Sequence, residues 1–300
     1  MKKKTYLFAL MAMVLTLGSC SDNENGIGGE TSKYITVSTS IGNMTRVATD
    51  EKGGQTFEEG DEISVYAWTG DATVAPETRE RVVNNAINKL TNGSWVSNPQ
   101  MLWKNNRDKH YFIGVSPISA ISDLSAGEYT FDVNKQTESD LLVAVNKDGL
   151  SYNVDEQQTV PLTFTHVMAK LAVNLTYKNQ WGGIPTVEKV VVGNAAKEAT
   201  INYLTKVVTP STTAKEDFSL PEITENTKYV SVIIPQEEVT QLTIVIGGKN
   251  FVYDNGTPFK LESGKITTVN LEVGRDEIKL GDVKITNWED GSTFSGEALN

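Results

Sequence analysis

The chain of 300 residues contains 38 Asp and Glu against 27 Lys and Arg, which gives a formal net charge of −11. This excess of negative charge argues against nucleic acid and anionic lipid surfaces as partners. Cys20 is the one cysteine, so no disulfide can form within the chain and the folded part must depend on packing.

The first 20 residues have the pattern of a bacterial lipoprotein signal. Three lysines after Met1 precede an apolar run over residues 6–17, which is too short to cross a bilayer core and marks a cleaved secretory signal. The run ends in Leu17-Gly18-Ser19-Cys20, with two small residues before the cysteine. We therefore expect removal of residues 1–19 and acylation of Cys20, the new N-terminus. Two or three acyl chains hold a protein firmly on a membrane.

Residues 20–32 are polar and rich in glycine, with almost no side chain that could enter a core. We expect a flexible tether, which spans roughly 20 Å. The acidic residues just after Cys20 resemble export tags that send some lipoproteins to the outer face of the outer membrane. The expected location is therefore the cell outer membrane, with the folded part exposed at the surface.

From residue 33 onward, apolar and polar residues alternate over short stretches that Gly, Asn, Asp and Pro interrupt. This pattern is typical of short antiparallel strands and predicts an all-β chain. The first expected strand, over residues 33–41, places Ile35, Val37, Thr39 and Ile41 on one face. Further strands are expected at residues 62–68, 111–115, 141–145, 159–165, 170–177, 187–192, 229–234, 242–246, 251–253, 266–273 and 283–288.

The length that follows the signal is enough for two domains. The expected strands at 159–165 and 170–177 meet at a kink over residues 165–168, where the chain could pass from one core to the next. We therefore expect an N-terminal β-sandwich over residues 33–160 and a C-terminal β-sandwich over residues 161–300, with the boundary placed to within about ten residues.

The chain offers no pattern for catalysis or for a bound cofactor. Its only histidines, His110 and His166, lie 56 residues apart, and no Cys or His cluster has zinc spacing. The sequence contains neither a Gly-x-Ser-x-Gly elbow nor an Asp-x-Asp-x-Asp calcium loop. We predict that the protein is not an enzyme and binds no metal or cofactor. For His166, between two strands, we predict a structural hydrogen-bonding role.

A series of short sequence blocks runs through the chain after the tether. Residues 57–67 have the form Phe-x-x-Gly-Asp-x-Ile-x-Val, and residues 160–175 form the longest block. The other blocks are Thr45-Arg46 and residues 93–95, 102–103, 111–113 with Pro117, 140–144, 233–236 and 285–291. In this order, the blocks resemble the fimbrillin family, the lipoprotein pilins of Gram-negative anaerobes. The resemblance also makes residues 82–90 an expected strand, although their apolar residues recur at helical spacing.

The resemblance implies two transthyretin-like β-sandwiches in tandem that polymerise by strand donation. In this scheme a trypsin-like protease cuts after an arginine just past the first strand, which here is the bond between Arg46 and Val47. The emptied groove then accepts a strand from the next subunit. One cut would discard residues 20–46, and with them both the lipid and the first strand.

The strand that this cut would remove carries Ile35, Val37, Thr39 and Ile41 on its inner face. Three buried apolar side chains at roughly 1.5 to 3 kcal/mol each amount to about 5 to 9 kcal/mol, as an upper estimate. This is comparable with the stability of a whole domain, about 5 to 15 kcal/mol. A subunit without the strand should therefore be a poor monomer and a good acceptor for β-augmentation.

A donor must be a terminal segment with its own alternation, and residues 276–300 are the natural candidate. The apolar residues of this segment are Ile278, Leu280, Val283 and Ile285. The alternative is that residues 283–288 simply form the last strand of the second sandwich and leave a short polar tail. The sequence alone favours neither.

The resemblance implies other fimbrillin subunits as partners, in a homo- or heteropolymer, together with a trypsin-like processing protease. Before processing, the lipid on Cys20 holds the chain on the outer membrane, and after processing the chain belongs to a fimbrium that contributes to adhesion. The pair Thr45-Arg46 favours a place in the stalk or at the tip over the anchor position.

Two other interpretations stay open. Arg46 can be an ordinary solvated arginine in a polar loop. The protein can also be a monomeric surface lipoprotein that binds glycans or host ligands through aromatic stacking. The tryptophans that would supply such a platform are Trp68, Trp95, Trp103, Trp181 and Trp288.

Overall fold

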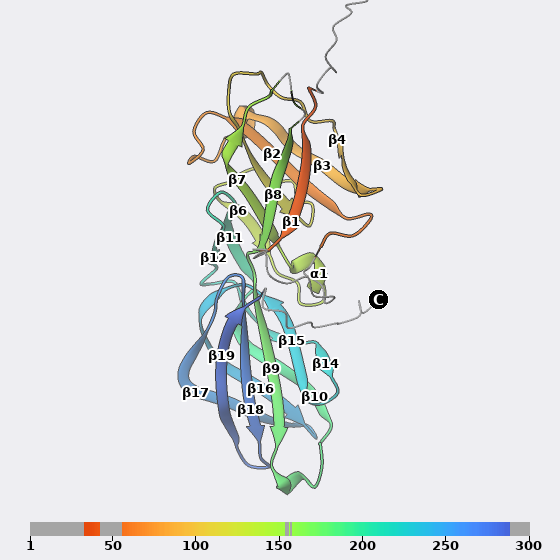
Figure 1. Cartoon of the computed structure of the whole chain (residues 1–300). Coiled ribbons are helices and arrows are strands. Elements are labelled where there is room, and N and C mark those ends of the chain that lie inside the picture. The colour runs from red at the N-terminus through yellow and green to blue at the C-terminus, as the bar shows by residue number, and fades with distance from the viewer. Residues whose placement is uncertain (1–32, 43–55, 154–155, 157, 289–300) are drawn as a thin grey trace, which may run out of the picture.

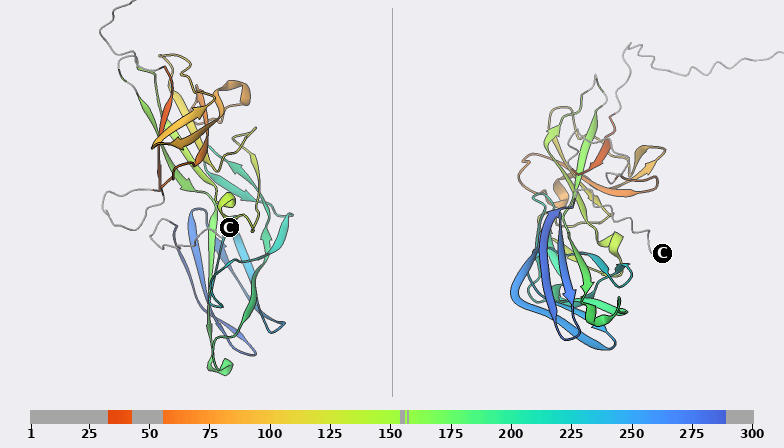
Figure 2. Two further views of the ribbon diagram at one scale, coloured as in Figure 1. Left: turned by 90° about the vertical axis from the view of Figure 1, so that its right-hand side faces the viewer. Right: turned by 60° about the horizontal axis from the view of Figure 1, so that its bottom comes forward.

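The structure, a computed structural model, describes residues 33–42, 56–153, 156 and 158–288. Its secondary structure is almost entirely β-strand, arranged as two β-sandwiches stacked end to end in an elongated molecule (Figure 1, Figure 2). The predicted all-β fold class is confirmed. The expected signal and tether, residues 1–32, and the expected cleavage site, Arg46-Val47, lie outside the described residues.

The first sandwich contains a seven-stranded sheet with the strand order β1-β8-β7-β5-β2-β3-β4. Its strands are β1 (Thr36–Ile41), β2 (Glu62–Thr69), β3 (Arg81–Thr91), β4 (Ser94–Asn98), β5 (His110–Ser116), β7 (Leu142–Leu150) and β8 (Thr159–His166). Neighbouring strands are antiparallel, except that β1 and β8 run parallel. Residues 82–90 belong to β3, as the resemblance implied, and the helical turn η1 before it covers only Thr78–Glu80.

A three-stranded sheet, β12-β11-β6, combines strands from both halves of the sequence. Strand β6 (Gly127–Thr130) pairs with β11 (Glu198–Asn202), which pairs in turn with β12 (Val207–Pro210). In Figure 1 this sheet lies between the upper and lower parts of the molecule. Residues 198–210 therefore belong with the first sandwich, and the expected division between residues 160 and 161 falls inside β8. The sandwiches are not separated at a single point in the sequence.

The second sandwich packs a four-stranded sheet, β13-β10-β16-β17, against a five-stranded sheet, β14-β15-β9-β18-β19. The strands are β9 (Ala169–Tyr177), β10 (Val187–Ala196), β13 (Lys215–Ser219), β14 (Glu222–Thr224), β15 (Lys228–Ile233), β16 (Gln236–Ile246), β17 (Lys249–Leu261), β18 (Lys265–Val273) and β19 (Ile278–Asn287). The chain enters this sandwich at the kink between β8 and β9, where Val167 and Met168 are both buried.

One apolar cluster runs continuously through the junction of the two sandwiches. It extends from Ile113 on the seven-stranded sheet through Ile201 on β11 to Leu171 and Val269 in the second sandwich, and each of these side chains is fully buried. Because a shared core leaves no polar boundary between the sandwiches, the two parts behave as one packed unit.

A short helix adds a polar contact across the same junction. The helix α1 (Gln136–Ser139) precedes β7 of the first sandwich and lies against β15 of the second. The Gln136 side chain donates a hydrogen bond from Nε2 to Ser231 Oγ at 3.0 Å, and its Oε1 accepts one from the Val232 backbone N–H at 2.6 Å. These bonds help to fix the relative position of the two sandwiches, because a partly buried amide that donates and accepts at once tolerates little displacement.

One face of the seven-stranded sheet packs into the continuous cluster, and its opposite face encloses a second apolar cluster. Strand β2 shows how the alternation of the sequence serves both faces: Ile63 and Val65 enter this second cluster, whereas Tyr66 and Trp68 enter the continuous one. The sheet is therefore buried on both faces, which is why β2 is apolar at every position from Val65 to Trp68.

Gly127 on β6 lies where the two halves of the chain approach each other closely. A Cβ added there would lie 2.5 Å from Cε2 of Tyr203, a side chain that is itself buried. We expect Gly127→Ala to lower the free energy of unfolding by about 1 to 3 kcal/mol through overpacking, as measured by urea denaturation. The neighbouring exposed change Glu128→Ala should cost no more than about 0.5 kcal/mol. Equal losses in the two variants would contradict this packing account.

Candidate functional site

Strand β1 is an edge strand of the seven-stranded sheet and pairs along its length with β8. The parallel register runs from Thr36 opposite Thr159 to Ile41 opposite Phe164. The start of β1 is held on its second side too, because the Ile35 N–H donates to the Met101 carbonyl at 2.9 Å. Beyond that point its second backbone edge faces a groove.

The side chains of β1, and of Ile35 directly before it, divide into an inner and an outer row. Ile35 and Val37 are buried, at 2% and 6% exposure, in the cluster enclosed by the sheet. Thr39 and Ile41 continue the same row and are partly buried, whereas Ser38, between Val37 and Thr39, points the other way and is exposed. The structure thus places the four residues of the expected removable strand in one row, with the deepest burial at its N-terminal end.

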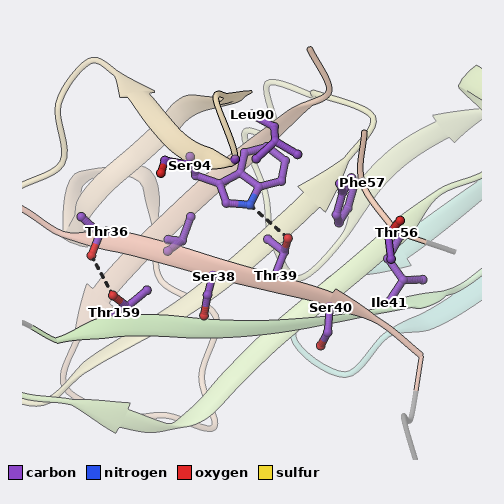
Figure 3. A pocket seen from close by; sticks show the side chains of 13 residues that line it. Thr36, Ser38, Thr39, Ser40, Ile41, Thr56, Phe57, Leu90, Ser94 and Thr159 are labelled. Atoms are coloured by element: carbon purple, nitrogen blue, oxygen red, sulfur yellow. Dashed lines mark hydrogen bonds between the residues drawn. The ribbon is translucent and has the colours of Figure 1, made fainter. Parts of the chain in front are cut away.

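The groove beside β1 has a volume of about 590 Å³ and lies between the two edges of one sheet (Figure 3). Its far wall is the β3–β4 hairpin, and Trp95 Nε1 donates a hydrogen bond across it to Thr39 Oγ1 at 3.0 Å. The described lining residues are Thr36, Val37, Ser38, Thr39, Ser40, Ile41, Thr56, Phe57, Leu90, Gly93, Ser94, Trp95 and Thr159. Because none of these residues is charged, the groove suits an extended segment of polypeptide better than an ionic ligand or a reaction that needs an acid or a base.

Phe57 closes one end of the groove. Its ring meets the ring of Trp95 edge-on, with centroids 5.3 Å apart, and meets Phe164 in the same manner at 5.1 Å. The N–H of Gly42, directly after β1, donates to the Phe164 carbonyl at 2.8 Å. The segment that contains Arg46 therefore leaves and re-enters the described structure at this end of the groove.

The expected donor segment forms the last strand of the second sandwich. Strand β19 lies at the edge of the five-stranded sheet, antiparallel to β18. Ile278 and Leu280 are partly buried against the continuous cluster, whereas Val283 and Ile285 are exposed at 36% and 39%. In this conformation the segment forms the last strand of the second sandwich, as the alternative proposed. Most of the side chains of this strand are exposed.

The five tryptophans do not gather on one surface. Trp68, Trp103 and Trp288 are buried, and Trp95 and Trp181 are partly buried at separate places, beside the groove and beside Phe251. Their rings mostly fill the interiors of the sandwiches. A common sugar-stacking platform is therefore not formed by the described residues.

The two histidines lie in different surroundings. His166, at the end of β8, contacts Asp140 through Nδ1 and Oδ1 at 2.7 Å, a structural contact of the kind that the sequence predicted. His110 is fully buried beside Trp103. Within the described ranges, no three His, Cys, Asp or Glu side chains are grouped so that they could hold a metal ion. None of the helices formed by the described residues has the length and apolarity to cross a membrane.

Sequence reasoning did not identify the walls of the groove. Phe57 and Trp95 each belong to a block that supported the resemblance, but neither block indicated that the two rings meet across the edge of a sheet. The available signal was an aromatic residue at the start of one block and another after a Gly-Ser turn. Only the tertiary fold places Phe57 and Trp95 beside β1.

Comparisons with known proteins agree with this architecture. The sequence model of a family described as fimbrillin-like matches residues 45–288. A protein of Bacteroides uniformis, provisionally named fimbrium subunit Fim1C, is 24% identical over 315 residues, which cover 97% of each chain.

Solved structures share the fold. A crystal structure from Bacteroides uniformis, provisionally described as a cell adhesion protein, has a TM-score of 0.62 and 19% identity, covering 85% of this chain and 98% of that one. A second one from Bacteroides ovatus, with the same provisional description, has a TM-score of 0.63 and 16% identity, with the same coverage. A fimbrial protein from Bacteroides vulgatus has a TM-score of 0.53 and 12% identity, covering 86% of this chain and 100% of that one.

The inner row of β1 should carry more stability than its outer row. We expect Ile35→Ala to lower the free energy of unfolding by about 2 to 5 kcal/mol, because it removes buried methyl groups and leaves a cavity. The exposed Ser38→Ala change on the same strand is the matched control and should cost no more than about 0.5 kcal/mol. Urea denaturation followed by tryptophan fluorescence measures both. A small loss for Ile35→Ala would mean that β1 is not part of the packed core.

His110 should make the first sandwich sensitive to mild acid. The Lys104 N–H donates to Nε2 of His110 at 3.0 Å, so the neutral ring carries its proton on Nδ1 and donates it to the Asp108 carbonyl at 3.1 Å. Burial lowers the pKa of His110 below its usual value of 6.5.

As the pH falls, His110 therefore binds a proton more readily in the unfolded chain than in the folded chain. The free energy of unfolding should fall as the pH drops below about 6.5. We expect a lower melting temperature at pH 5.5 than at pH 7.5, measured by circular dichroism. The variant His110→Gln, which keeps an acceptor but cannot titrate, should show a smaller difference. An unchanged difference in this variant would assign the effect to other groups.

Proposed function

Because the chain belongs to the fimbrillin-like family, we propose that it is a structural subunit of a cell-surface fimbrium that assembles by strand exchange at the β1 groove and contributes to adhesion. The observation that supports this most is the position of β1. It is an edge strand with a buried inner row of side chains, and its second backbone edge faces a groove lined by uncharged residues. Such a strand can be replaced by another extended segment without rebuilding the sheet.

We infer that export begins with a lipoprotein signal and that Cys20 carries the lipid that holds the unprocessed chain on the outer membrane. A trypsin-like protease then cuts between Arg46 and Val47. The segment with Arg46 connects Gly42 to Thr56, both at one end of the groove, so a single cut there releases β1 and the lipid together. The remaining chain is free to leave the membrane for the fibre.

The loss of β1 would make the subunit unstable as a monomer. Ile35 and Val37 together contribute about 3 to 6 kcal/mol of burial, as an upper estimate, against a domain stability of about 5 to 15 kcal/mol. The cut would also uncover the backbone edge of β8 and the side chains of Val160 and Leu162. An unpaired edge over an exposed core is a template for a strand from another chain.

Strand β19 is the proposed donor. It alternates apolar and polar residues, lies at a sheet edge and pairs with β18 alone in the described structure. Val283 and Ile285 are 36% and 39% exposed on their own domain, so moving β19 into the groove of another subunit would bury them further. Exchange therefore gains burial at the acceptor and gives up the pairing of β19 with β18 at the donor.

Processing at Arg46 should be visible as a change of the mature N-terminus. We expect mass spectrometry of the surface-expressed protein to find a chain that begins at Val47, and heating-resistant ladders in detergent gels. Arg46→Gln should abolish both, because a trypsin-like protease requires a basic residue before the cut. Lys52→Gln, which changes another basic residue between the same two described ends, is the matched control and should be processed normally. A native chain that begins only at acylated Cys20 would refute the processed-subunit proposal.

A further inference from the structure

Trp288 is the one buried residue of the stretch from Ile278 to Trp288. It follows directly after β19, and its indole is stacked on the imidazole of His166, with ring centroids 4.1 Å apart and an angle of 7° between the planes. His166 ends β8, the last strand that the first sandwich receives before the chain crosses to the second. The end of the donor strand is thus packed against the junction of the two sandwiches.

We call this site the junction clasp. Its residues are Asp140, His166, Lys170 and Trp288, and three contacts besides the ring stack hold it together. Lys170 Nζ lies 4.3 Å from the centre of the Trp288 ring, close enough for a cation–π interaction. Asp140 Oδ1 lies 2.7 Å from His166 Nδ1 and orients the imidazole. The backbone N–H of Trp288 donates a hydrogen bond to the Gly264 carbonyl at 3.1 Å.

The clasp is a desolvated site. The His166 side chain is 3% exposed, and Trp288 is 7% exposed. Burial lowers the pKa of Lys170, and an ammonium group that has lost water interacts more strongly with an aromatic face. The Nε1–H of Trp288 is buried without a hydrogen-bond partner among the described residues. The interaction therefore depends on the faces of the indole ring rather than on its polar atom.

The remainder of β19 is held differently. Apart from its backbone pairing with β18, the strand has surface contacts such as the hydrogen bond from Asn270 Nδ2 to Asp282 Oδ1 at 2.6 Å. Ile278 and Leu280 give partial burial at the opposite end of the strand. Water competes with the exposed polar contacts, so they contribute little to holding the strand.

We propose that Trp288 is a lock for the C-terminal strand: its ring, held by His166 and Lys170 at the junction, keeps β19 on its own domain until the ring is withdrawn. This inference deepens the proposed function, because it rests on β19 being the donor. It makes Trp288 a positioning residue that sets when a subunit can donate. The lock couples release to the junction, since Asp140 and His166 come from the first sandwich and Lys170 and Trp288 from the second.

Amide hydrogen exchange of the purified, uncut protein tests the lock directly. In Trp288→Ala, residues 279–287 should exchange at least tenfold faster than in the wild type, while β2 and β5 keep their protection and show that the chain remains folded. Lys284→Ala, which truncates an exposed residue of the same strand, is the control and should change the rates less than twofold. Wild-type rates in Trp288→Ala overturn the proposal.

Two further variants separate ring stacking from general packing. Trp288→Phe keeps an aromatic face and should retain most of the protection, because the indole N–H has no described partner. Trp288→Leu keeps apolar volume without a ring and should exchange several-fold faster than Trp288→Phe. Equal rates in these two variants overturn the stacking role, and this comparison remains available where Trp288→Ala fails to fold.

Fibre formation by the same variants distinguishes the lock from the donor role. Faster exchange of β19 together with earlier ladders in detergent gels supports both. Faster exchange with unchanged ladder formation supports the lock and overturns β19 as the donor. Unchanged exchange overturns the lock whatever the ladders show.

Discussion

The first sandwich depends on a strand that is fully paired on one side only. Strand β1 and the residue before it supply Val37 and Ile35 to an enclosed core, and the sole partner of β1 along its length is β8. An ordinary edge strand protects its sheet with charge or twist. Here the second edge faces a groove with uncharged walls instead. The proposed exchange of this strand rests on the combination of deep burial and one-sided pairing.

The shared core has a second consequence for a fibre subunit. The three-stranded sheet takes β6 from one half of the sequence and β11 and β12 from the other, and the apolar cluster passes through it into the second sandwich. Bending at the junction would therefore open buried surface. The proposed acceptor groove and the proposed donor strand are therefore joined through one continuous packed core.

Sequence blocks that carry no chemistry individually acquire a role through their contacts. Phe57, Trp95 and Phe164 come from three separate blocks and meet at one end of the groove. His166 and Trp288 come from the longest block and from the last one, and they stack at the junction. The order of the blocks supported a family assignment. Their meeting points explain why aromatic residues occupy those positions.

The sequence by itself determined the all-β class and the location of most long strands, because alternation over six or more residues is a local property. It also indicated which side chains of β1 share a face. It did not indicate β4, β6 or β11 to β14, since strands this short carry too little periodicity to stand out from loops. Nor did it indicate that residues 198–202 pair with β6 from the other half of the chain, because that contact joins segments far apart in the sequence.

Only the tertiary structure decided which strands pair. The parallel alignment of β1 with β8, the groove opposite the β3–β4 hairpin and the stack of Trp288 on His166 all join residues far apart in the chain. Strand pairing is selected by how whole faces pack, and the same alternating segment can pair with many partners until a core excludes the others. Local pattern therefore specifies the strands, and long-range packing specifies their neighbours.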